Sequence, residues 1–233
     1  MKTEIFLIRH GQSETNLTEV FTGSVDAPLT DLGKRQAKKS AEYLKEKKID
    51  VIFSSSLKRA IETAKAFSEM WGIPIIEEKG FNEIFFGDWS GITYSEAREK
   101  TPKEYDAFKN NIGSFKAPGG ESAEELFKRV SEAFARILKE NEGKKILIIT
   151  HGIVIKALLT LWQGKDFKDM QYEAVLTNGS ITFTEKEEDR FNILFKGLDE
   201  HLMELKTEAP KLLKNNEILE RLGYNMSIEN FLG

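Results

Sequence analysis

The feature that most constrains the fold is an unbroken apolar run that stops at a histidine. Ile5 to Ile8 show no alternation of apolar and polar positions, and Arg9, His10 and Gly11 follow directly. Such a run is typical of a parallel strand that is covered on both faces of its sheet. The sequence therefore predicts a buried strand that delivers Arg9 and His10 to the open edge of an α/β sheet.

The same arrangement occurs again later in the chain. The run 145–150, which is apolar over most of its length, is followed by His151 and Gly152. Ligands of α/β sheets bind outside the carboxyl ends of the strands, so the two histidines are predicted to meet at one site. The apolar segment 153–162 is predicted to be a buried helix, and the free N–H groups at its start can receive an anion.

The segments around these two strands predict the rest of the fold. Short strands alternate with amphipathic helices, which gives expected elements over about 30–48, 50–53, 57–70, 73–76 and 122–138. The apolar runs 180–184 and 191–195 flank a charged turn and are expected to pair antiparallel at an edge. The predicted fold class is therefore a three-layer α/β/α arrangement around a mostly parallel sheet with an antiparallel edge strand.

Two segments depart from this regular pattern. Residues 80–120 are irregular and rich in aromatic side chains, and we interpret them as an insertion over the working edge of the sheet. Residues 199–233 suggest helices broken at Pro210 and Gly223. We expect one domain over 1–198, with 199–233 as a helical extension that packs on it, forms a dimer contact or covers the pocket.

Composition excludes several classes of function. The chain has 233 residues and no cysteine, so disulfides, thiolate zinc sites and cysteine nucleophiles are excluded. No apolar run approaches the ~18 residues of a membrane span. The net charge of −4 argues against a general nucleic-acid binder, so any phosphate site must be a local basic cluster. We expect a soluble, unprocessed protein of the cytoplasm.

A third basic side chain belongs to the predicted site. Arg59 lies in the first turn of a helix that follows the strand 50–53, at the same edge as the two histidines. Arg9, Arg59 and the two imidazoles would form a cationic clamp for a phosphoryl group, because guanidinium groups make paired hydrogen bonds to phosphate oxygens. The alternative for Arg59 is a surface ion pair with Glu62.

These residues belong to a longer series of motifs that resembles the histidine phosphatase superfamily, in its phosphoglycerate mutase-like branch. The matching positions follow the family order over roughly the first 180 residues, which makes coincidence unlikely in a way that one short motif would not. They are Arg9-His10-Gly11-Gln12, Asn16, Thr22-Gly23, 26–30, Gly33, Ser54-Ser55, Leu57, Arg59-Ala60, Thr63-Ala64, Glu83, Gly87, Trp89, Gly91, Gly120-Glu121-Ser122 and Thr150-His151-Gly152.

The resemblance implies a role for each site residue. His10 would attack phosphorus and form a phosphohistidine, with its other ring nitrogen held by a backbone carbonyl. Arg9, Arg59 and His151 would bind the non-bridging oxygens, and Glu83 would protonate the leaving alkoxide and later accept a proton from water. The phosphate or substrate would also be bound by Asn16, Thr22, Gly23 and Gly152. No metal and no cofactor is implied.

The same chemistry serves two reactions. Mutases of this family resemble one another in having basic residues just after the acidic one, but Glu83 is followed by Ile84, Phe85 and Phe86. A bisphosphorylated cofactor would be poorly held without those charges. We therefore favour a phosphatase that acts on a small phosphorylated metabolite, with a cofactor-dependent phosphoglycerate mutase-type transfer as the first alternative.

Further alternatives stay open at this point. The chain could be a non-catalytic relative that binds phosphorylated ligands or proteins, although the complete residue set argues against it. A homodimer is compatible with the sequence, and His201 is expected to be structural or exposed. Four aromatic side chains, which more often belong to a core, could instead line a substrate pocket: Phe21, Phe85, Phe86 and Trp89.

Overall fold

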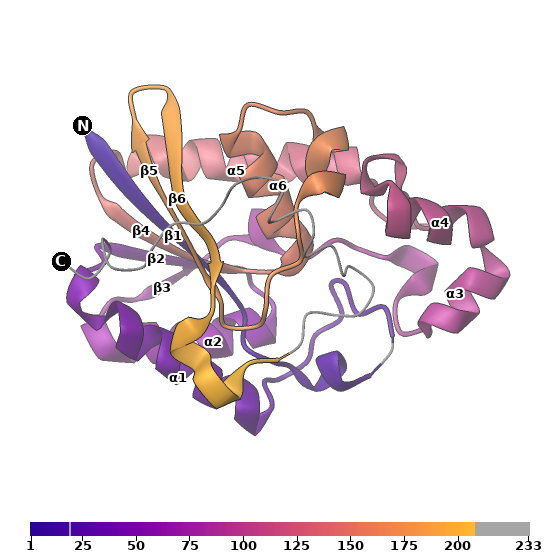
Figure 1. Cartoon of the computed structure of the whole chain (residues 1–233), viewed down its shortest axis with the longest axis horizontal. Coiled ribbons are helices and arrows are strands. Elements are labelled where there is room, and N and C mark those ends of the chain that lie inside the picture. Colours follow the sequence, from indigo (N-terminus) through magenta and orange to yellow (C-terminus); the bar gives the residue numbers. More distant parts are fainter. Residues whose placement is uncertain (19, 208–233) are drawn as a thin grey trace.

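The computed structural model describes residues 1–18 and 20–207 (Figure 1). A six-stranded sheet in the order β3-β2-β4-β1-β5-β6 forms its centre. The first four strands in the chain are mutually parallel, while β5 runs antiparallel to β1 and to β6. The predicted fold class is confirmed. The strands are β1 (Lys2–Arg9), β2 (Val51–Ser54), β3 (Ile75–Glu77), β4 (Lys145–Thr150), β5 (Ile181–Glu187) and β6 (Arg190–Leu198).

The two strands that end in histidine are direct neighbours. β1 pairs with β4 in a register that sets Arg9 against Thr150. The ladder continues one step further, because the His10 N–H donates to the Thr150 carbonyl over 2.9 Å. Side chains from the apolar part of both strands are fully buried, as expected for central parallel strands. His10 and His151 therefore leave the sheet side by side.

Helices cover both faces of the sheet, which gives three layers (Figure 1). Alternate residues of the strands feed two separate cores, because neighbouring side chains of a strand point to opposite faces. One core contacts α1 (Asp31–Leu44) and α2 (Lys58–Trp71), and the other contacts α5 (Ala123–Glu140) and α6 (Gly152–Trp162). Almost every residue of α6 is buried, which explains its nearly continuous apolar sequence.

The segment 80–120 builds one end of the molecule beside the carboxyl ends of the strands. It contains α3 (Tyr94–Lys100) and α4 (Pro102–Asn110), which project from the sheet in Figure 1. Phe21, from the loop after β1, packs edge-on against Tyr94 and Phe108 at centroid distances of 4.7 and 5.1 Å. Aromatic packing thus ties this segment to the first loop of the chain.

The hairpin at the sheet edge is longer than predicted. β5 and β6 extend through most of the charged segment 185–190, and only Glu188 and Asp189 form the turn. Charged side chains are tolerated there because they can face solvent while the backbone continues its ladder. No helix among residues 1–18 and 20–207 is long and apolar enough to cross a membrane.

After β6 a short helix, η7 (Glu200–Leu205), packs on α1. Leu202 and Leu205 are buried, and the Gln36 side chain donates to the Leu205 carbonyl over 2.7 Å. The predicted breaks at Pro210 and Gly223 lie outside the described residues. The division of the chain into 1–198 and 199–233 stays a prediction.

His201 in η7 gives the fold a measurable pH dependence. Its Nε2 lies 3.0 Å from the Ser40 hydroxyl, and burial lowers the pKa of the imidazole from 6.5 to about 4. As pH falls below 6.5 the unfolded chain therefore binds this proton first, so stability is lost between pH 6.5 and about 4. We expect His201→Gln to remove up to about 3 kcal/mol of that loss.

Urea unfolding of both proteins at a series of pH values measures this difference. Other groups titrate in the same range, so the relevant quantity is the gap between the two curves. If the free energies of unfolding of the wild type and His201→Gln fell in parallel from pH 7 to 4, the buried neutral state of His201 would be wrong.

Candidate active site

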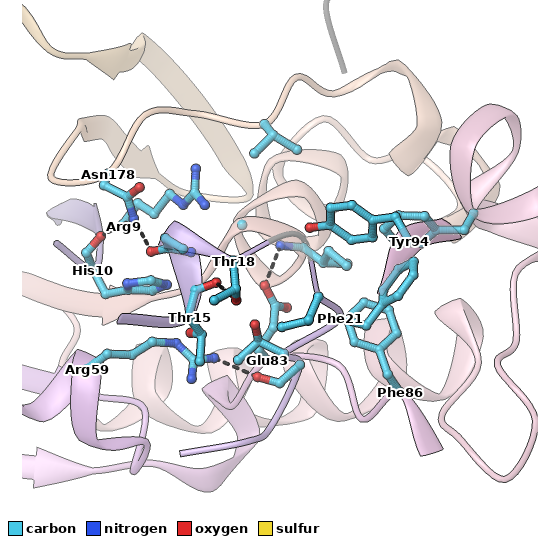
Figure 2. A pocket seen from close by; sticks show the side chains of 18 of the residues that line it. Arg9, His10, Thr15, Thr18, Phe21, Arg59, Glu83, Phe86, Tyr94 and Asn178 are labelled. Carbon is cyan, nitrogen blue, oxygen red and sulfur yellow. Dashed lines mark hydrogen bonds between the residues drawn. The ribbon is translucent and has the colours of Figure 1, made fainter. Parts of the chain in front are cut away.

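A cavity of about 600 Å³ opens at the carboxyl ends of β1 and β4. Figure 2 shows Arg9, His10 and Arg59 on one side and aromatic side chains on the other, with Glu83 between them. Among the predicted site residues, those that line the cavity are Arg9, His10, Asn16, Thr22, Gly23, Arg59, Glu83 and Gly152. His151 does not line it, because it is fully buried beside His10 with ring centroids 5.0 Å apart.

His10 is held as a neutral imidazole in one tautomer. Its Nδ1 lies 2.7 Å from the Gly11 carbonyl, which can only accept, so Nδ1 carries the proton and Nε2 carries the lone pair. Burial, with Arg59 and Arg9 nearby, lowers the pKa of His10 well below 6.5. The expected carbonyl partner is thus present. Asn178, which the sequence analysis missed, donates from its side chain to the His10 carbonyl over 2.9 Å.

Arg59 faces the cavity rather than the solvent. Arg59 is 3% exposed, and its guanidinium donates to the carbonyls of Val25 and Gly23, at 2.8 and 2.6 Å. The alternative of a surface ion pair is wrong, because Arg59 is buried and the Glu62 carboxylate accepts instead from the Leu29 N–H over 2.7 Å. Carbonyl oxygens orient the guanidinium without neutralising it, so its positive charge remains available to an anion.

Gly23 acts through the backbone. Its φ is +48°, and a Cβ added there would lie 2.4 Å from the Ile84 carbonyl oxygen. Only glycine fits this left-handed, crowded position, and its carbonyl then meets Arg59. The neighbouring Thr22 is half-buried on the cavity wall.

Arg9 leaves part of its guanidinium unused. One Nη donates to the Leu176 carbonyl, whereas the buried Nε has no hydrogen-bond partner within the part of the chain that the structure describes. Burial lowers the pKa of Arg9 to about 10, which leaves it charged at neutral pH. A buried N–H donor without a partner, beside His10, suits an incoming anion.

His151 is fixed in the opposite tautomer by a chain of hydrogen bonds. The Ser56 N–H lies 2.9 Å from a side-chain atom of Asn82, which must therefore be the oxygen Oδ1. That oxygen lies 2.8 Å from the Ser55 hydroxyl, so Ser55 donates its only proton to it. Ser55 can then only accept from His151, whose Nε2 lies 2.7 Å away. Nε2 of His151 carries the proton.

The free nitrogen of His151 is consequently an acceptor. Its Nδ1 is buried and has no hydrogen-bond partner among the described residues. Burial, together with Arg59, His10, Arg9 and Arg129, lowers the pKa of His151 well below 6.5. In this tautomer Nδ1 of a neutral His151 can accept a hydrogen bond but cannot donate one, so contact with an oxygen that carries no proton would require an additional proton.

Glu83 is placed at the start of α6. Its Oε2 accepts from the Ile153 N–H over 3.1 Å, and its Oε1 accepts from the N–H of Ile84 over 3.0 Å. A Cβ added to Gly152 would lie 3.9 Å from both Arg9 Nε and Glu83 Oε2. Arg9 and Glu83 therefore both approach the start of α6 at Gly152.

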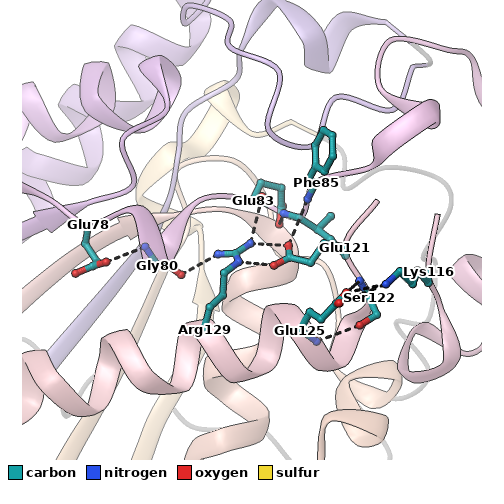
Figure 3. A network of polar contacts seen from close by, with 10 residues as sticks. Glu78, Gly80, Glu83, Phe85, Lys116, Glu121, Ser122, Glu125 and Arg129 are labelled. Atoms are coloured by element: carbon teal, nitrogen blue, oxygen red, sulfur yellow. Dashed lines mark hydrogen bonds and ion pairs between the residues drawn. The ribbon is translucent and has the colours of Figure 1, made fainter. Parts of the chain in front are cut away.

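Arg129 on α5 holds the backbone that carries Glu83. Its guanidinium donates to the Gly80 carbonyl over 2.9 Å and to the Glu83 carbonyl over 3.4 Å (Figure 3). Glu121 accepts from the same guanidinium at 2.6 and 2.9 Å and fixes its orientation. Arg129 is therefore a positioning residue for Glu83.

The cavity has further lining residues, of which some were predicted from the sequence and one was not. The side-chain oxygen of Asn16 accepts from Ser13 and Asn178, which leaves its NH₂ group to donate. Phe21 and Phe86 line the cavity, whereas Trp89 belongs to the core and Phe85 is 48% exposed. Lys156 also lines the cavity and was missed, although a lone charge within an apolar helix is a signal that could have found it.

Among residues 1–18 and 20–207, no three His, Asp or Glu side chains cluster in a way that could hold a metal ion.

Comparison with known proteins assigns the chain to a family. A model described as the histidine phosphatase superfamily (branch 1) matches residues 5–198. The chain is 34% identical over 204 residues to phosphoglycerate mutase-like protein 4 of Arabidopsis thaliana, covering 86% of this chain and 87% of that protein. It is 34% identical over 200 residues to the uncharacterized phosphatase PhoE of Bacillus subtilis, covering 86% and 97%.

A solved structure agrees with these relatives. Bacillus stearothermophilus YhfR is similar with a TM-score of 0.82 at 29% identity, covering 86% of this chain and 99% of that one. The protein belongs to the histidine phosphatase superfamily, branch 1, and is an enzyme of the phosphatase or mutase type. The resemblance in its sequence motifs is confirmed.

The tautomer of His151 predicts proton uptake on anion binding. At pH 8 we expect sulfate, a tetrahedral dianion that carries no proton of its own, to bind with uptake of about one proton. Ser55→Ala removes the acceptor for Nε2, so the imidazole can move its proton to Nδ1 and donate directly. Uptake should then fall toward zero.

Calorimetry in two buffers of different ionisation enthalpy measures this proton. Ser54→Ala is the matched control, because the Ser54 hydroxyl donates to the Ser55 carbonyl over 2.9 Å rather than to a histidine. Equal uptake in the wild type and Ser55→Ala would show that Ser55 does not set the tautomer.

Proposed function

We propose that the protein is a metal-independent phosphatase that hydrolyses a small phosphomonoester through a phosphohistidine on His10. The observation that carries this proposal is the state of His10 in the cavity. Its Nδ1 proton is committed to the Gly11 carbonyl, so the Nε2 lone pair is the nucleophile, beside the cationic Arg9 and Arg59.

The first step transfers the phosphoryl group to the protein. Nε2 of His10 attacks phosphorus while the bond from phosphorus to the ester oxygen breaks, and Glu83 supplies the proton that the departing alkoxide takes. Arg9 and Arg59 bind the non-bridging oxygens and stabilise the charge that spreads over them. Asn16 donates its NH₂ group to the same oxygens.

The second step returns the enzyme to its starting state. Water attacks phosphorus and loses a proton to Glu83, the bond between phosphorus and Nε2 breaks, and its electron pair returns to the imidazole. The proton shared with His151 Nδ1 offsets charge on the phosphoryl group in both steps. Arg129 keeps Glu83 at the start of α6 throughout.

Hydrolysis is favoured over mutase-type transfer by the wall next to Glu83. Ile84 is buried, Phe85 is 48% exposed, and Phe86 lines the cavity without charge. A bisphosphorylated cofactor needs cations for its second phosphate. This wall offers none, and the two lysines that line the cavity, Lys109 and Lys156, lie on other parts of it. A cavity of about 600 Å³ suits a small molecule.

A panel of phosphomonoesters, assayed with EDTA present and beside a coupled mutase assay, tests this function. We expect phosphate release that EDTA does not abolish, with no mutase turnover. Loss of activity in EDTA would contradict the metal-independent mechanism, and efficient transfer in the coupled assay would favour the mutase.

His10→Ala tests the nucleophile. We expect turnover to fall by at least about 10³-fold, because removing a covalent nucleophile leaves only binding and electrostatic stabilisation. Rapid quenching of the wild type should trap acid-labile, base-stable phosphate that is absent from the variant. His201→Gln, a histidine change outside the cavity, should retain both turnover and the phosphorylated intermediate. Full turnover in His10→Ala would refute the assignment.

A further inference from the structure

Lys156 is a buried cation on the wall of the cavity. It lies on α6 and is 4% exposed, in a helix that is otherwise almost entirely apolar. Residues four apart share one face of a helix, and both Gly152 and Lys156 line the cavity. With a rise of about 1.5 Å per residue, Lys156 lies roughly 6 Å along the helix from the end where the phosphoryl group is expected.

The charge of Lys156 is not balanced within the described part of the chain. Its Nζ donates to the backbone carbonyl of Glu173, and it forms no ion pair with any carboxylate of residues 1–18 and 20–207. The Glu173 carboxylate is instead bound by Lys196 at 3.0 and 3.2 Å and by the Gln163 amide. Lys196, rather than Lys156, therefore forms the ion pair with this carboxylate.

A buried ammonium group that forms no ion pair is unfavourable unless an anion approaches it. Lysine is almost never fully buried unless it is paired, and an isolated buried charge is strongly destabilising. Burial lowers the pKa of Lys156 to about 8, while the nearby Glu173 opposes that shift, so the ammonium form still predominates at pH 7. A ligand anion at this wall would compensate the charge of the buried ammonium group.

Apolar and aromatic side chains line part of the cavity. Ile153 and Val175 lie on the wall near α6, and Phe21, Tyr105 and Phe108 line the aromatic side. Arg9 and Glu83 bound the phosphoryl end, and the exposed Lys109 on α4 lies at the wall formed by the segment 80–120. A ligand that fills this cavity would carry an anion at each end of a short apolar body.

We propose that Lys156 forms an anion subsite for a carboxylate of the substrate, so that the preferred substrates are phosphomonoesters that also carry a carboxylate. This inference rests on the proposed phosphatase function. A carboxylate suits the subsite better than a second phosphoryl group, because one lysine neutralises a single negative charge and the backbone around it supplies an acceptor rather than a donor.

Matched substrates test the subsite. The series consists of ω-phosphooxy alkanoates of two to five carbons, each compared with the alkyl phosphate of the same length. In the wild type we expect kcat/KM to favour one carboxylated length over its alkyl phosphate by about 10- to 100-fold, the range of a hydrogen bond to a charged group. The pH dependence of kcat/KM reports the ionisation of groups in the free enzyme. Lys156 loses its positive charge as pH rises through its pKa of about 8, so the preference should decline over that range.

Lys156→Met removes the charge at similar length, and Lys156→Arg keeps it. We expect the methionine variant to lose the preference while it still hydrolyses the alkyl phosphates, and the arginine variant to retain part of it. Lys128→Met, which removes an exposed lysine of α5 outside the cavity, controls for the change in net charge. An unchanged preference in Lys156→Met, or no preference in the wild type, overturns the subsite.

Calorimetry on His10→Ala separates this inference from the proposed function. Tighter binding of the carboxylated ligand that disappears in the double variant His10→Ala with Lys156→Met would support the subsite even if no phosphate were released. Hydrolysis without any dependence on the carboxylate would leave the phosphatase function intact and refute the subsite. Tighter binding of an alkyl bisphosphate than of any carboxylated ligand would contradict the choice of a carboxylate.

Discussion

The pairing of β1 with β4 is the constraint on which the site depends. Parallel neighbours in register bring their carboxyl ends to the same edge, and the bond from His10 N–H to the Thr150 carbonyl extends that register beyond the strands. The strand register alone therefore brings the centroids of the two imidazole rings to 5.0 Å from each other. Arg59 and Glu83 reach the same edge because α2 and the segment 80–120 both follow strands that end there.

The arginines of the site are buried, and they can bind an anion only if their partners orient the guanidinium groups without cancelling their charge. Carbonyl oxygens hold Arg59 and Arg9, and both histidines are kept neutral by burial and by the arginines beside them. The two imidazoles then differ in tautomer, because Gly11 offers an acceptor to Nδ1 of one and Ser55 offers an acceptor to Nε2 of the other. His10 therefore has its lone pair on Nε2, and His151 has its lone pair on Nδ1.

The sequence predicted the strands, the main helices and the fold class because each rests on a local pattern. Unalternating apolar runs and the spacing of apolar residues in amphipathic helices act over a few residues and survive without tertiary context. The hairpin of β5 and β6 was predicted too short, since charged residues in an edge strand carry no local signal that the ladder continues. For the aromatic residues, the sequence could not distinguish Phe86 on the cavity wall from Trp89 in the core.

The sequence by itself determined the family, the fold and the residues that can carry phosphoryl chemistry, because these follow from motifs in a fixed order along the chain. Only the tertiary structure decided which nitrogen of each histidine carries the proton, how the charged side chains are oriented and which of them are paired. Ser55 meets His151 across 96 positions of the chain, and Asn82 contacts Ser55 across 27. Arg129 reaches the Glu83 carbonyl from α5, and Glu173 is bound by Lys196 rather than by Lys156. Proton positions and unbalanced charges arise from such long-range contacts, and no local pattern encodes them.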